Sequence, residues 1–466
     1  MAILQQKRRS AATNKGMTRF NKKSGVVRKT MRSRPATERL KRRLKKGKTP
    51  ERKHLTRRMR ARKRSVKRRI VGRQTLAPQV TTHHIDPMVS EGITFSTLLD
   101  FTSMDLHNSR VATSNVSGGP YETAIWFIPQ IANVYYGGFH TIFRYAEYLH
   151  RTRGIRSNFA VTMSGNAEQY RSQIAQAFPL LSDCALIAVP DINNLSAIPP
   201  HDIGFCTLWI TAYPLLKFNG VRKKIYFMQD YEPYFYPAGS VSSQAQATYR
   251  FGFTAICNTV SLKNSYEAHG GTAVHFTPAL NTKVFHPHSR PKHKDKLRLF
   301  FYGRPNAYRN CFELGTAAIR LIKNVLGDRV EIISAGSTWD HSAYGIDGLV
   351  THYGFMPYEQ TGELYRSCDA GLVLMATRHP SYPPLELAAC GALVITNVNE
   401  WNNWIWKDGV NCLLTEMSAS SIAEKVIQGL TDIKLRHRIT TQSIHDMTNN
   451  HSNWDSELKR VTEAVF

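Results

Sequence analysis

Short apolar runs alternate with amphipathic segments from about residue 120 onward, and this alternation restricts the fold more than any other feature. Such a pattern is typical of βα units that build a parallel sheet. A first series of predicted strands covers 123–129, 158–163, 184–189, 204–211, 223–230 and 253–258. Between the first two strands, Ile142, Phe143, Ala146 and Leu149 fall on one face of a predicted helix. The sequence therefore predicts a doubly wound domain.

A second series of the same kind follows a proline- and charge-rich stretch, 278–296, which reads as an inter-domain linker. Its predicted strands cover 297–303, 330–336, 371–376 and 392–397. A helix is predicted over about 310–325, with an inward face made of Phe312, Leu314, Ala317, Ala318, Leu321 and Ile322. We therefore expect two Rossmann-like domains that face a cleft, spanning about 81–290 and 291–446.

The basic character of the chain is confined to its first 80 residues. They hold 30 of the 62 Lys and Arg residues but only two acids, Glu38 and Glu51, so the rest of the chain has 32 residues of each sign. One aromatic residue, Phe20, cannot form a core, and we expect disorder or marginal helix. The segment could bind anionic lipid or nucleic acid, or serve only as a solvated tail.

The remaining composition favours a cytoplasmic protein, which the basic segment could hold on the inner face of the cytoplasmic membrane. No early apolar core resembles a secretory signal, and no apolar run reaches the ~18 residues of a membrane span. The seven cysteines are scattered singly, which favours buried reduced thiols. We see no pair of carboxylates or His/Cys cluster with metal-ligand spacing, and therefore predict a site without metal.

Candidate site residues follow the predicted strands, because open α/β sheets bind ligands beyond the carboxyl ends of their strands. Gly137 and Gly138 precede a helix whose first N–H groups favour an anion, although a plain tight turn would explain them equally well. Gly303, Arg304 and Arg309 stand at a strand-to-helix turn, where two guanidinium groups can clamp a diphosphate. An arginine pair that caps a sheet edge is the alternative.

Residues 352–397, and above all the run RHPSYPPLELAACG from Arg378, resemble the nucleotide-sugar half of family 4 glycosyltransferases, which have the GT-B fold. The resemblance implies that Gly303, Arg304 and Arg309 bind the donor's diphosphate. It also implies that Glu386, ahead of a small-residue helix, binds the nucleotide ribose. The same likeness suggests that 447–466 form a helix that crosses back to the first domain, and that transfer retains the anomeric configuration.

One position departs from the family pattern. A second glutamate usually stands eight residues before the ribose-binding one, near the donor sugar, but here that position is Arg378. Together with 135–149 and 226–237, the loop with Arg378, Tyr382 and Pro383 is similar to WsaF-type bacterial rhamnosyltransferases. The resemblance implies dTDP-rhamnose as co-substrate, no other cofactor, and a glycan acceptor, free or lipid-linked, on a growing cell-surface polysaccharide.

The acceptor side offers two candidate catalytic carboxylates, Asp230 and Glu232, which follow the predicted strand 223–230. Either could orient or deprotonate an acceptor hydroxyl, and either could equally be a solvated loop residue. Two other functions stay open. The chain could be a GT-B nucleotide-sugar isomerase, which needs no acceptor, or a non-catalytic binding protein tethered to a polyanion through its basic segment.

Overall fold

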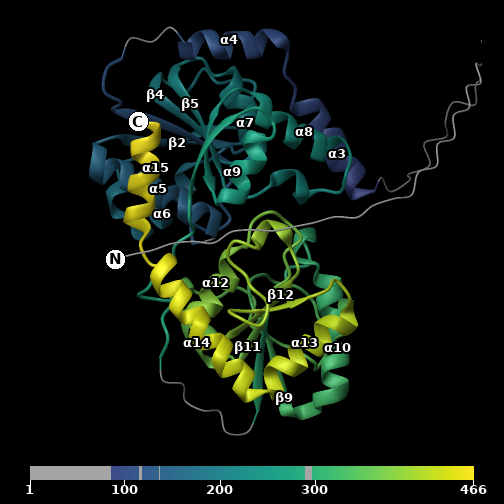
Figure 1. The fold of residues 1–466 in the computed structure, drawn as a ribbon. Helices are drawn as coiled ribbons and strands as arrows, with labels where there is room; N and C mark the ends of the chain where they lie inside the picture. The colour runs from purple at the N-terminus through teal and green to yellow at the C-terminus, as the bar shows by residue number, and fades with distance from the viewer. Residues whose placement is uncertain (1–85, 115–117, 136, 289–295) are drawn as a thin grey trace, which may run out of the picture. The chain divides into compact units, whose positions relative to one another are not determined.

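The computed structural model describes residues 86–114, 118–135, 137–288 and 296–466. All of these residues belong to one compact unit, Ile85–Phe466. The basic segment predicted for residues 1–80 lies outside the described residues. Two parallel sheets, each with its own helices, organise the unit Ile85–Phe466 (Figure 1). The prediction of two doubly wound sheets is therefore confirmed.

The first sheet has seven parallel strands in the order β3-β2-β1-β4-β5-β6-β7. They are β1 (Thr123–Ile128), β2 (Arg156–Thr162), β3 (Leu186–Val189), β4 (His201–Cys206), β5 (Val221–Met228), β6 (Thr254–Asn258) and β7 (Thr272–Phe276). The chain winds outward from β1 to β3 and then returns to add β4 on the other side of β1. The reversal places a topological switch point between β1 and β4, where such sheets bind ligands.

The second sheet has six parallel strands in the order β10-β9-β8-β11-β12-β13 and reverses between β8 and β11. They are β8 (Leu297–Phe301), β9 (Val330–Ser334), β10 (Thr351–His352), β11 (Ala370–Leu372), β12 (Leu393–Asn397) and β13 (Leu413–Thr415). The two sheets thus share one winding rule, and each supplies a switch point.

Helices cover both faces of each sheet, which is why the central strands are apolar on both sides (Figure 1). On β1, Trp126 packs among residues of the first helical layer, and its neighbour Phe127 packs into the opposite layer. The helices before the second sheet are α3 (Pro87–Leu98), α4 (Ser103–Ser114), α5 (Gly137–Arg153), α6 (Arg171–Ala177), α7 (Trp209–Lys217), α8 (Ser240–Ala247) and α9 (Val260–Glu267). Those after β8 are α10 (Phe312–Leu326), α11 (Tyr358–Ser367), α12 (Tyr382–Ala389), α13 (Ala419–Thr431), α14 (Ile433–Asn450) and α15 (Trp454–Val465).

The last helix, α15, packs against the first sheet, although it follows the second sheet in sequence. Its Leu458 and Val461 are buried in the same cluster as Trp126 of β1. The hydroxyl groups of Tyr145 on α5 and Thr462 on α15 lie 3.2 Å apart. The C-terminal helix therefore joins the helical layer of α5 (Figure 1).

Some predicted elements were wrong in extent. The strand predicted over 204–211 ends at Cys206, because the Thr211 hydroxyl accepts the N–H groups of Thr207 and Leu208 and turns the chain into α7. On α10, Leu321 is 36% exposed, whereas Ile319 is buried, so the buried face is rotated from the predicted one. The short strands β7, β10 and β13 were not predicted.

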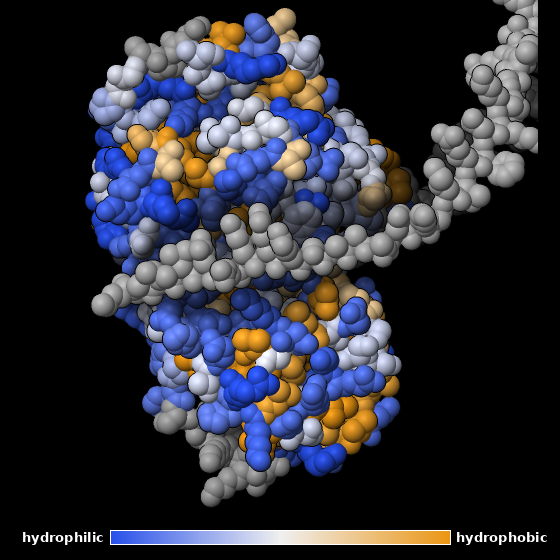
Figure 2. Space-filling model, in the orientation of Figure 1, coloured by the Kyte–Doolittle hydropathy of each residue, from blue (hydrophilic) through white to orange (hydrophobic). Residues whose placement is uncertain are grey.

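The surface in Figure 2 mixes hydrophilic and apolar side chains, while the sheets and the facing sides of their helices form the core. All seven cysteines lie in the described part of the chain, where each is buried and none forms a disulfide, as predicted. Within the described residues, no helix is both long and apolar enough to span a membrane.

Candidate functional site

A cavity of about 480 Å³ lies between the carboxyl ends of the two sheets. Pro129 follows β1 and Thr207 follows β4, so the switch point of the first sheet forms one wall. Tyr302 and Arg304 follow β8 and belong to the opposite wall. The volume falls in the range of about 300–1,000 Å³ that is usual for ligand sites. The cavity therefore occupies the place that the winding of both sheets predicts.

Most of the predicted site residues line this cavity. They are Gly137, Gly138, Asp230, Glu232, Arg304, Arg309, Tyr382, Pro383 and Glu386. Gly303 and Arg378 were predicted with them but do not belong to the lining. Residues that lie up to 249 positions apart in the sequence thus meet around one cavity.

An ion pair joins the two walls of the cavity. The Nε of Arg309, in the short 3₁₀ turn Tyr308–Asn310, lies 3.2 Å from Oδ2 of Asp230, which follows β5. Oδ1 of Asp230 accepts hydrogen bonds from the Tyr231 N–H and the Thr377 hydroxyl. The Arg309 guanidinium also lies 4.2 Å from the centre of the Phe235 ring. Since Arg309 has five N–H donors, its contact with Asp230 leaves donors for a ligand.

The second guanidinium, Arg304, is held by the residue two positions before it. Its Nη1 donates to the Tyr302 hydroxyl at 3.2 Å, and its Cζ lies 5.9 Å from the centre of the Tyr302 ring. Arg304 and Arg309 together make one wall of the cavity cationic. Two guanidinium groups in this arrangement suit a diphosphate, whose oxygens accept charge-assisted hydrogen bonds.

Glu386 on α12 is the carboxylate of the second sheet's wall. Its side chain is accessible only in part, from the cavity that it lines. None of the described residues donates a hydrogen bond to its carboxyl group or forms an ion pair with it. Removal from bulk water raises the pKa of Glu386 to about 8. A buried carboxyl group without protein partners is suited to bind ligand hydroxyl groups.

Glu232, in contrast, is tied into the core of the first domain. It is 1% exposed, and its Oε2 accepts hydrogen bonds from the Tyr226 hydroxyl at 2.8 Å and from the Trp209 N–H. Because Trp209 is the first residue of α7, the carboxylate caps that helix. Burial raises the pKa of Glu232 to about 8, against the opposing effect of these hydrogen bonds. Its contacts are those of a structural residue at the edge of the cavity.

Gly137, at the start of α5, is a glycine for a reason that the sequence did not show. A Cβ atom there would lie 2.9 Å from Cδ2 of Tyr382 on the opposite wall. The Tyr382 hydroxyl lies 3.0 Å from the Thr141 hydroxyl and accepts a hydrogen bond from Asn258 Nδ2 at 2.9 Å. Tyr382 therefore links α12 to both α5 and β6, and its ring requires the absence of a side chain at Gly137. Gly138 faces the cavity and accepts a hydrogen bond from Gln229 through its carbonyl.

The predicted role of Arg378 at the donor sugar is not supported, because its side chain points elsewhere. Its guanidinium lies 3.9 Å from the ring centre of Tyr231 and 4.0 Å from that of Trp401, and its Nη1 donates to Ser265 at 2.9 Å. The group is thus held between two aromatic rings outside the cavity lining. Aromatic faces attract a guanidinium, so this position holds the loop in place.

Gly303 was predicted to bind a diphosphate, and it also lies outside the lining. A Cβ atom there would lie 2.9 Å from Ser334 Oγ and 3.1 Å from ring atoms of Phe301 and Phe312. Close packing at the end of β8 therefore explains this glycine. Pro383 does line the cavity but has no N–H group, and Pro384 has none either. The first turn of α12 consequently offers few backbone donors to an anion.

Among the cavity residues that the reasoning from sequence missed are three basic ones, His140, Arg144 and His379. His379, in the loop before α12, is 4% exposed and lines the cavity. Arg144 follows His140 by one turn of α5, and its Nη2 lies 2.8 Å from His140 Nε2. Burial and this guanidinium lower the pKa of His140 to about 3. The i, i+4 spacing on a predicted helix was the available signal for Arg144.

Comparisons with known proteins find a family model that resembles the domain of the second sheet. Residues 297–427 match the family model described as the C-terminal domain of WsaF. The O-antigen biosynthesis protein RfbC of Myxococcus xanthus is 38% identical over 376 residues. The alignment covers 79% of this chain and 29% of RfbC, so the chain spans less than a third of that relative. The resemblance found in the sequence is therefore confirmed.

Solved structures with the same fold share little sequence with the chain. The crystal structure of HepE from Anabaena in complex with UDP-glucose has a TM-score of 0.58 and 12% identity, over 74% of this chain and all of that one. Sucrose-phosphate synthase from Thermosynechococcus elongatus has a TM-score of 0.57 and 12% identity, over 74% of this chain and 98% of that one. These likenesses confirm the GT-B fold.

Proposed function

From the match of residues 297–427 to the C-terminal domain of WsaF, we propose that the chain is a glycosyltransferase of cell-surface glycan biosynthesis. The observation that carries the proposal is the cavity between the two sheets. It combines a carboxyl group without protein partners, Glu386, with two guanidinium groups, Arg304 and Arg309. A nucleotide-sugar has hydroxyl groups that can bind Glu386 and a diphosphate that can bind the two arginines.

In this proposal Glu386 binds the nucleotide's ribose or deoxyribose, and the two arginines bind its diphosphate. Transfer breaks the bond between the sugar's anomeric carbon and the diphosphate oxygen, which leaves with the bonding electrons. Negative charge then grows on the diphosphate, and a preorganised guanidinium stabilises it. The N–H groups at the start of α5, including Gly137 and Gly138, add positive potential to the same region.

The acceptor hydroxyl forms the new bond to the anomeric carbon and loses its proton. Asp230 faces the cavity and is fixed by Arg309, Thr377 and its own neighbour's N–H. We propose that Asp230 orients the acceptor hydroxyl and receives this proton. Glu232 is the weaker candidate, because its Oε2 already serves Tyr226 and the start of α7.

For the donor we propose dTDP-rhamnose, which rests on the likeness to WsaF-type rhamnosyltransferases. The solved relative HepE was crystallised with UDP-glucose, which supports a nucleotide-sugar of some kind. For the acceptor we propose a growing glycan, free or lipid-linked, in keeping with the O-antigen role named for RfbC. The Arg378 contacts outside the cavity leave the choice of sugar to other residues.

Two further parts of the proposal concern metal and partners. The guanidinium groups of Arg304 and Arg309 can neutralise the diphosphate, so we propose that transfer needs no metal ion. We also propose that the 30 basic residues among positions 1–80 bind anionic membranes, with nucleic acid as the competing partner. Vesicle and duplex-DNA binding at equal salt would separate these two partners.

The decisive experiment is a donor panel of dTDP-, UDP- and GDP-sugars, with release of nucleoside diphosphate as readout. We expect dTDP-rhamnose to be used best, only with added glycan acceptor, and equally well with chelator. Conversion of a nucleotide-sugar into an isomer, without acceptor and without release of nucleoside diphosphate, would favour an isomerase. A preference for UDP- or GDP-sugars would overturn the donor, and loss of activity in chelator would overturn metal independence.

A matched pair of arginine variants tests the site itself. Arg309→Ala should slow transfer by about 10²–10³-fold, the usual effect of deleting one preorganised donor. Arg320→Ala is the control, because Arg320 lies on α10, donates to the carbonyls of Tyr344 and Gly345, and is exposed outside the cavity. Equal loss in both variants would overturn the diphosphate site.

A further inference from the structure

His379 is a neutral imidazole whose proton position is fixed by its surroundings. Its Nδ1 accepts the N–H of Ser381 at 2.9 Å. A ring nitrogen that accepts a hydrogen bond carries no proton, so in the neutral ring the proton is on Nε2. Burial, with the nearby Arg309, lowers the pKa of His379 to about 4, so the ring is neutral near pH 7. The residue therefore presents one N–H donor at Nε2.

The Nε2–H group has no hydrogen-bond acceptor within the part of the protein that the structure describes. His379 is 4% exposed, and its Nε2 is buried with no hydrogen-bond partner among the described residues. Buried donors are nearly always paired, and leaving one unpaired is costly. Because His379 lines the cavity, a ligand in the cavity can supply the missing acceptor.

The loop is built to hold this ring. Ser381, whose N–H fixes Nδ1, has φ 65°, in the left-handed region that non-glycine residues rarely adopt. Two residues before His379, the Thr377 hydroxyl donates a hydrogen bond to Asp230 across the cleft. The Arg378 side chain is clamped between Tyr231 and Trp401. Anchors on both sides of His379 therefore restrict its movement.

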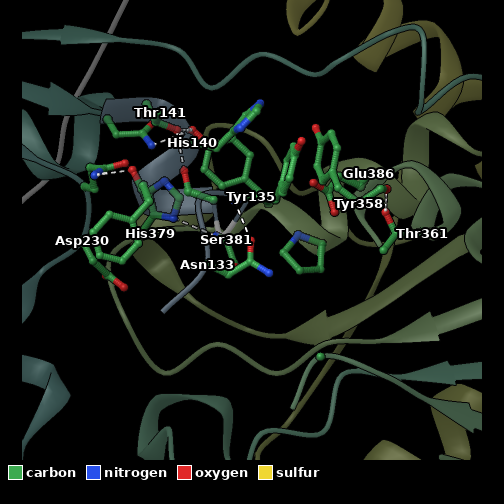
Figure 3. Close-up of a pocket in the computed structure, with 18 of the residues that line it drawn as sticks. Asn133, Tyr135, His140, Thr141, Asp230, Tyr358, Thr361, His379, Ser381 and Glu386 are labelled. Carbon is green, nitrogen blue, oxygen red and sulfur yellow. Dashed lines mark hydrogen bonds between the residues drawn. The ribbon is translucent and has the colours of Figure 1, made fainter. Parts of the chain in front are cut away.

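The position of His379 indicates which part of a ligand it meets. Figure 3 shows His379 beside Asp230 at one side of the pocket, whereas Glu386 lies beside Thr361 at the other side. Arg309 joins the His379 side through its ion pair with Asp230. If Glu386 holds the ribose and the arginines hold the diphosphate, the transferred sugar lies near His379.

We propose that Nε2–H of His379 donates a hydrogen bond to a hydroxyl oxygen of the transferred sugar and so determines which sugar the cleft accepts. This inference rests on the proposed function and deepens it. The contact with the donor sugar, which the sequence predicted for Arg378, is thereby assigned to the neutral N–H donor of His379. A neutral N–H suits a hydroxyl group, while the charged diphosphate is left to the arginines.

The test compares a nucleotide with and without its sugar. Binding of dTDP and of dTDP-rhamnose is measured by calorimetry for the wild type, His379→Phe and His379→Gln. Phenylalanine keeps the ring but removes the donor, and glutamine replaces the donor with an amide N–H. We expect His379→Phe to bind dTDP within about twofold of wild type but dTDP-rhamnose at least tenfold more weakly, with His379→Gln in between.

The outcomes separate this inference from the proposed function. If wild type binds neither dTDP nor dTDP-rhamnose nor the UDP and GDP equivalents, both proposals fall. If wild type binds them and His379→Phe weakens dTDP and dTDP-rhamnose equally, or neither, the role at the sugar is overturned while the donor site stands. Heteronuclear NMR of the imidazole supplies a second measurement, in which a proton found on Nδ1 would also overturn it.

Discussion

Two glutamates with little access to bulk water, one in each domain, differ in what surrounds them rather than in their pKa. Both Glu232 and Glu386 have the pKa raised to about 8 by burial. Glu232 accepts hydrogen bonds from Tyr226 and from the start of α7. Glu386 has no such partner among the described residues and opens on the cavity. A raised pKa alone would have selected both as site residues.

The comparison teaches that partners, not burial, separate a structural carboxyl group from one available to a ligand. A carboxyl group whose acceptor positions are filled by protein donors stabilises the fold. One that is held away from bulk water without donors gains them only when a ligand binds. We therefore infer that Glu232 stabilises the first domain, whereas Glu386, in the second domain, is available to bind a ligand.

The largest expected effect is on the pH dependence of folding, where the two groups should act in the same direction. The folded state keeps both carboxyl groups protonated above their ordinary pKa of 4.5, so it binds more protons than the unfolded state. The stability that these two groups contribute should therefore be fully present below pH 4.5 and be lost as pH rises to about 8. Each group can contribute about 5 kcal/mol at most.

Urea unfolding of wild type, Glu232→Gln and Glu386→Gln at pH 5 and pH 9 measures this effect. Each glutamine variant should lose part of the pH dependence, and Glu232→Gln should lose more, because Glu232 is 1% exposed whereas Glu386 is partly exposed to the cavity. Saturating dTDP should change the pH dependence that Glu386 contributes and leave that of Glu232. If neither variant alters the pH dependence, the carboxyl groups are not protonated in the folded state.

The second effect is on stability at pH 7, where the two sites should differ. Glu232→Ala leaves the Tyr226 hydroxyl and the Trp209 N–H without an acceptor, and it should lower the free energy of unfolding by about 3 kcal/mol. Glu386→Ala removes a carboxyl group without protein partners and should change it by less than about 1 kcal/mol. Chemical denaturation measures both. Equal losses would abolish the distinction between the two sites.

The third effect is on nucleotide affinity, which should depend on Glu386 more than on Glu232. At pH 9, where the Glu386 carboxyl group is ionised, Glu386→Ala should weaken dTDP binding by about 2 kcal/mol, roughly 30-fold, the usual value of a hydrogen bond to a charged group. Glu386→Gln keeps an acceptor oxygen and should lose less. Glu232→Gln is the matched control, with affinity close to that of wild type in calorimetry. Unchanged affinity in Glu386→Ala would remove the ribose site.

The fold was predictable because its signal is local. Buried parallel strands are apolar runs such as 123–128, and the helices between them repeat apolar residues at helical spacing, as α5 does with Ile142 and Leu149. Strand ends were less predictable, since a side-chain contact sets them. Thr211 ends β4 by binding N–H groups before it, and no hydropathy pattern shows this.

The site was predictable where a residue type follows a strand, as with Asp230, Arg309 and Glu386. Side-chain direction was not predictable, because it depends on contacts across the cleft. Arg378 lies in the predicted loop, but its side chain packs between two aromatic rings, whereas the side chain of its neighbour His379 lines the cavity. Gly137 read as a phosphate turn, yet its missing Cβ makes room for Tyr382, a residue of the other domain.

The smallest expected effect concerns Tyr382, which ties together the two walls that hold Glu232 and Glu386. Tyr382→Phe keeps the ring against Gly137 but removes the hydroxyl that meets Thr141 and Asn258. Two neutral hydrogen bonds shared by one hydroxyl suggest a loss of about 1 kcal/mol in the free energy of unfolding. Hydrogen exchange should rise at the start of α5 and in α12, but not in α13, which lies away from this contact.

A double-mutant cycle with Thr141→Val tests whether the contact itself is responsible. Thr141 and Tyr382 are side chains of opposite domains whose oxygens lie 3.0 Å apart, so their losses should be less than additive. Additive losses would mean that the Tyr382 hydroxyl acts through its hydrogen bond with Asn258 and not through Thr141.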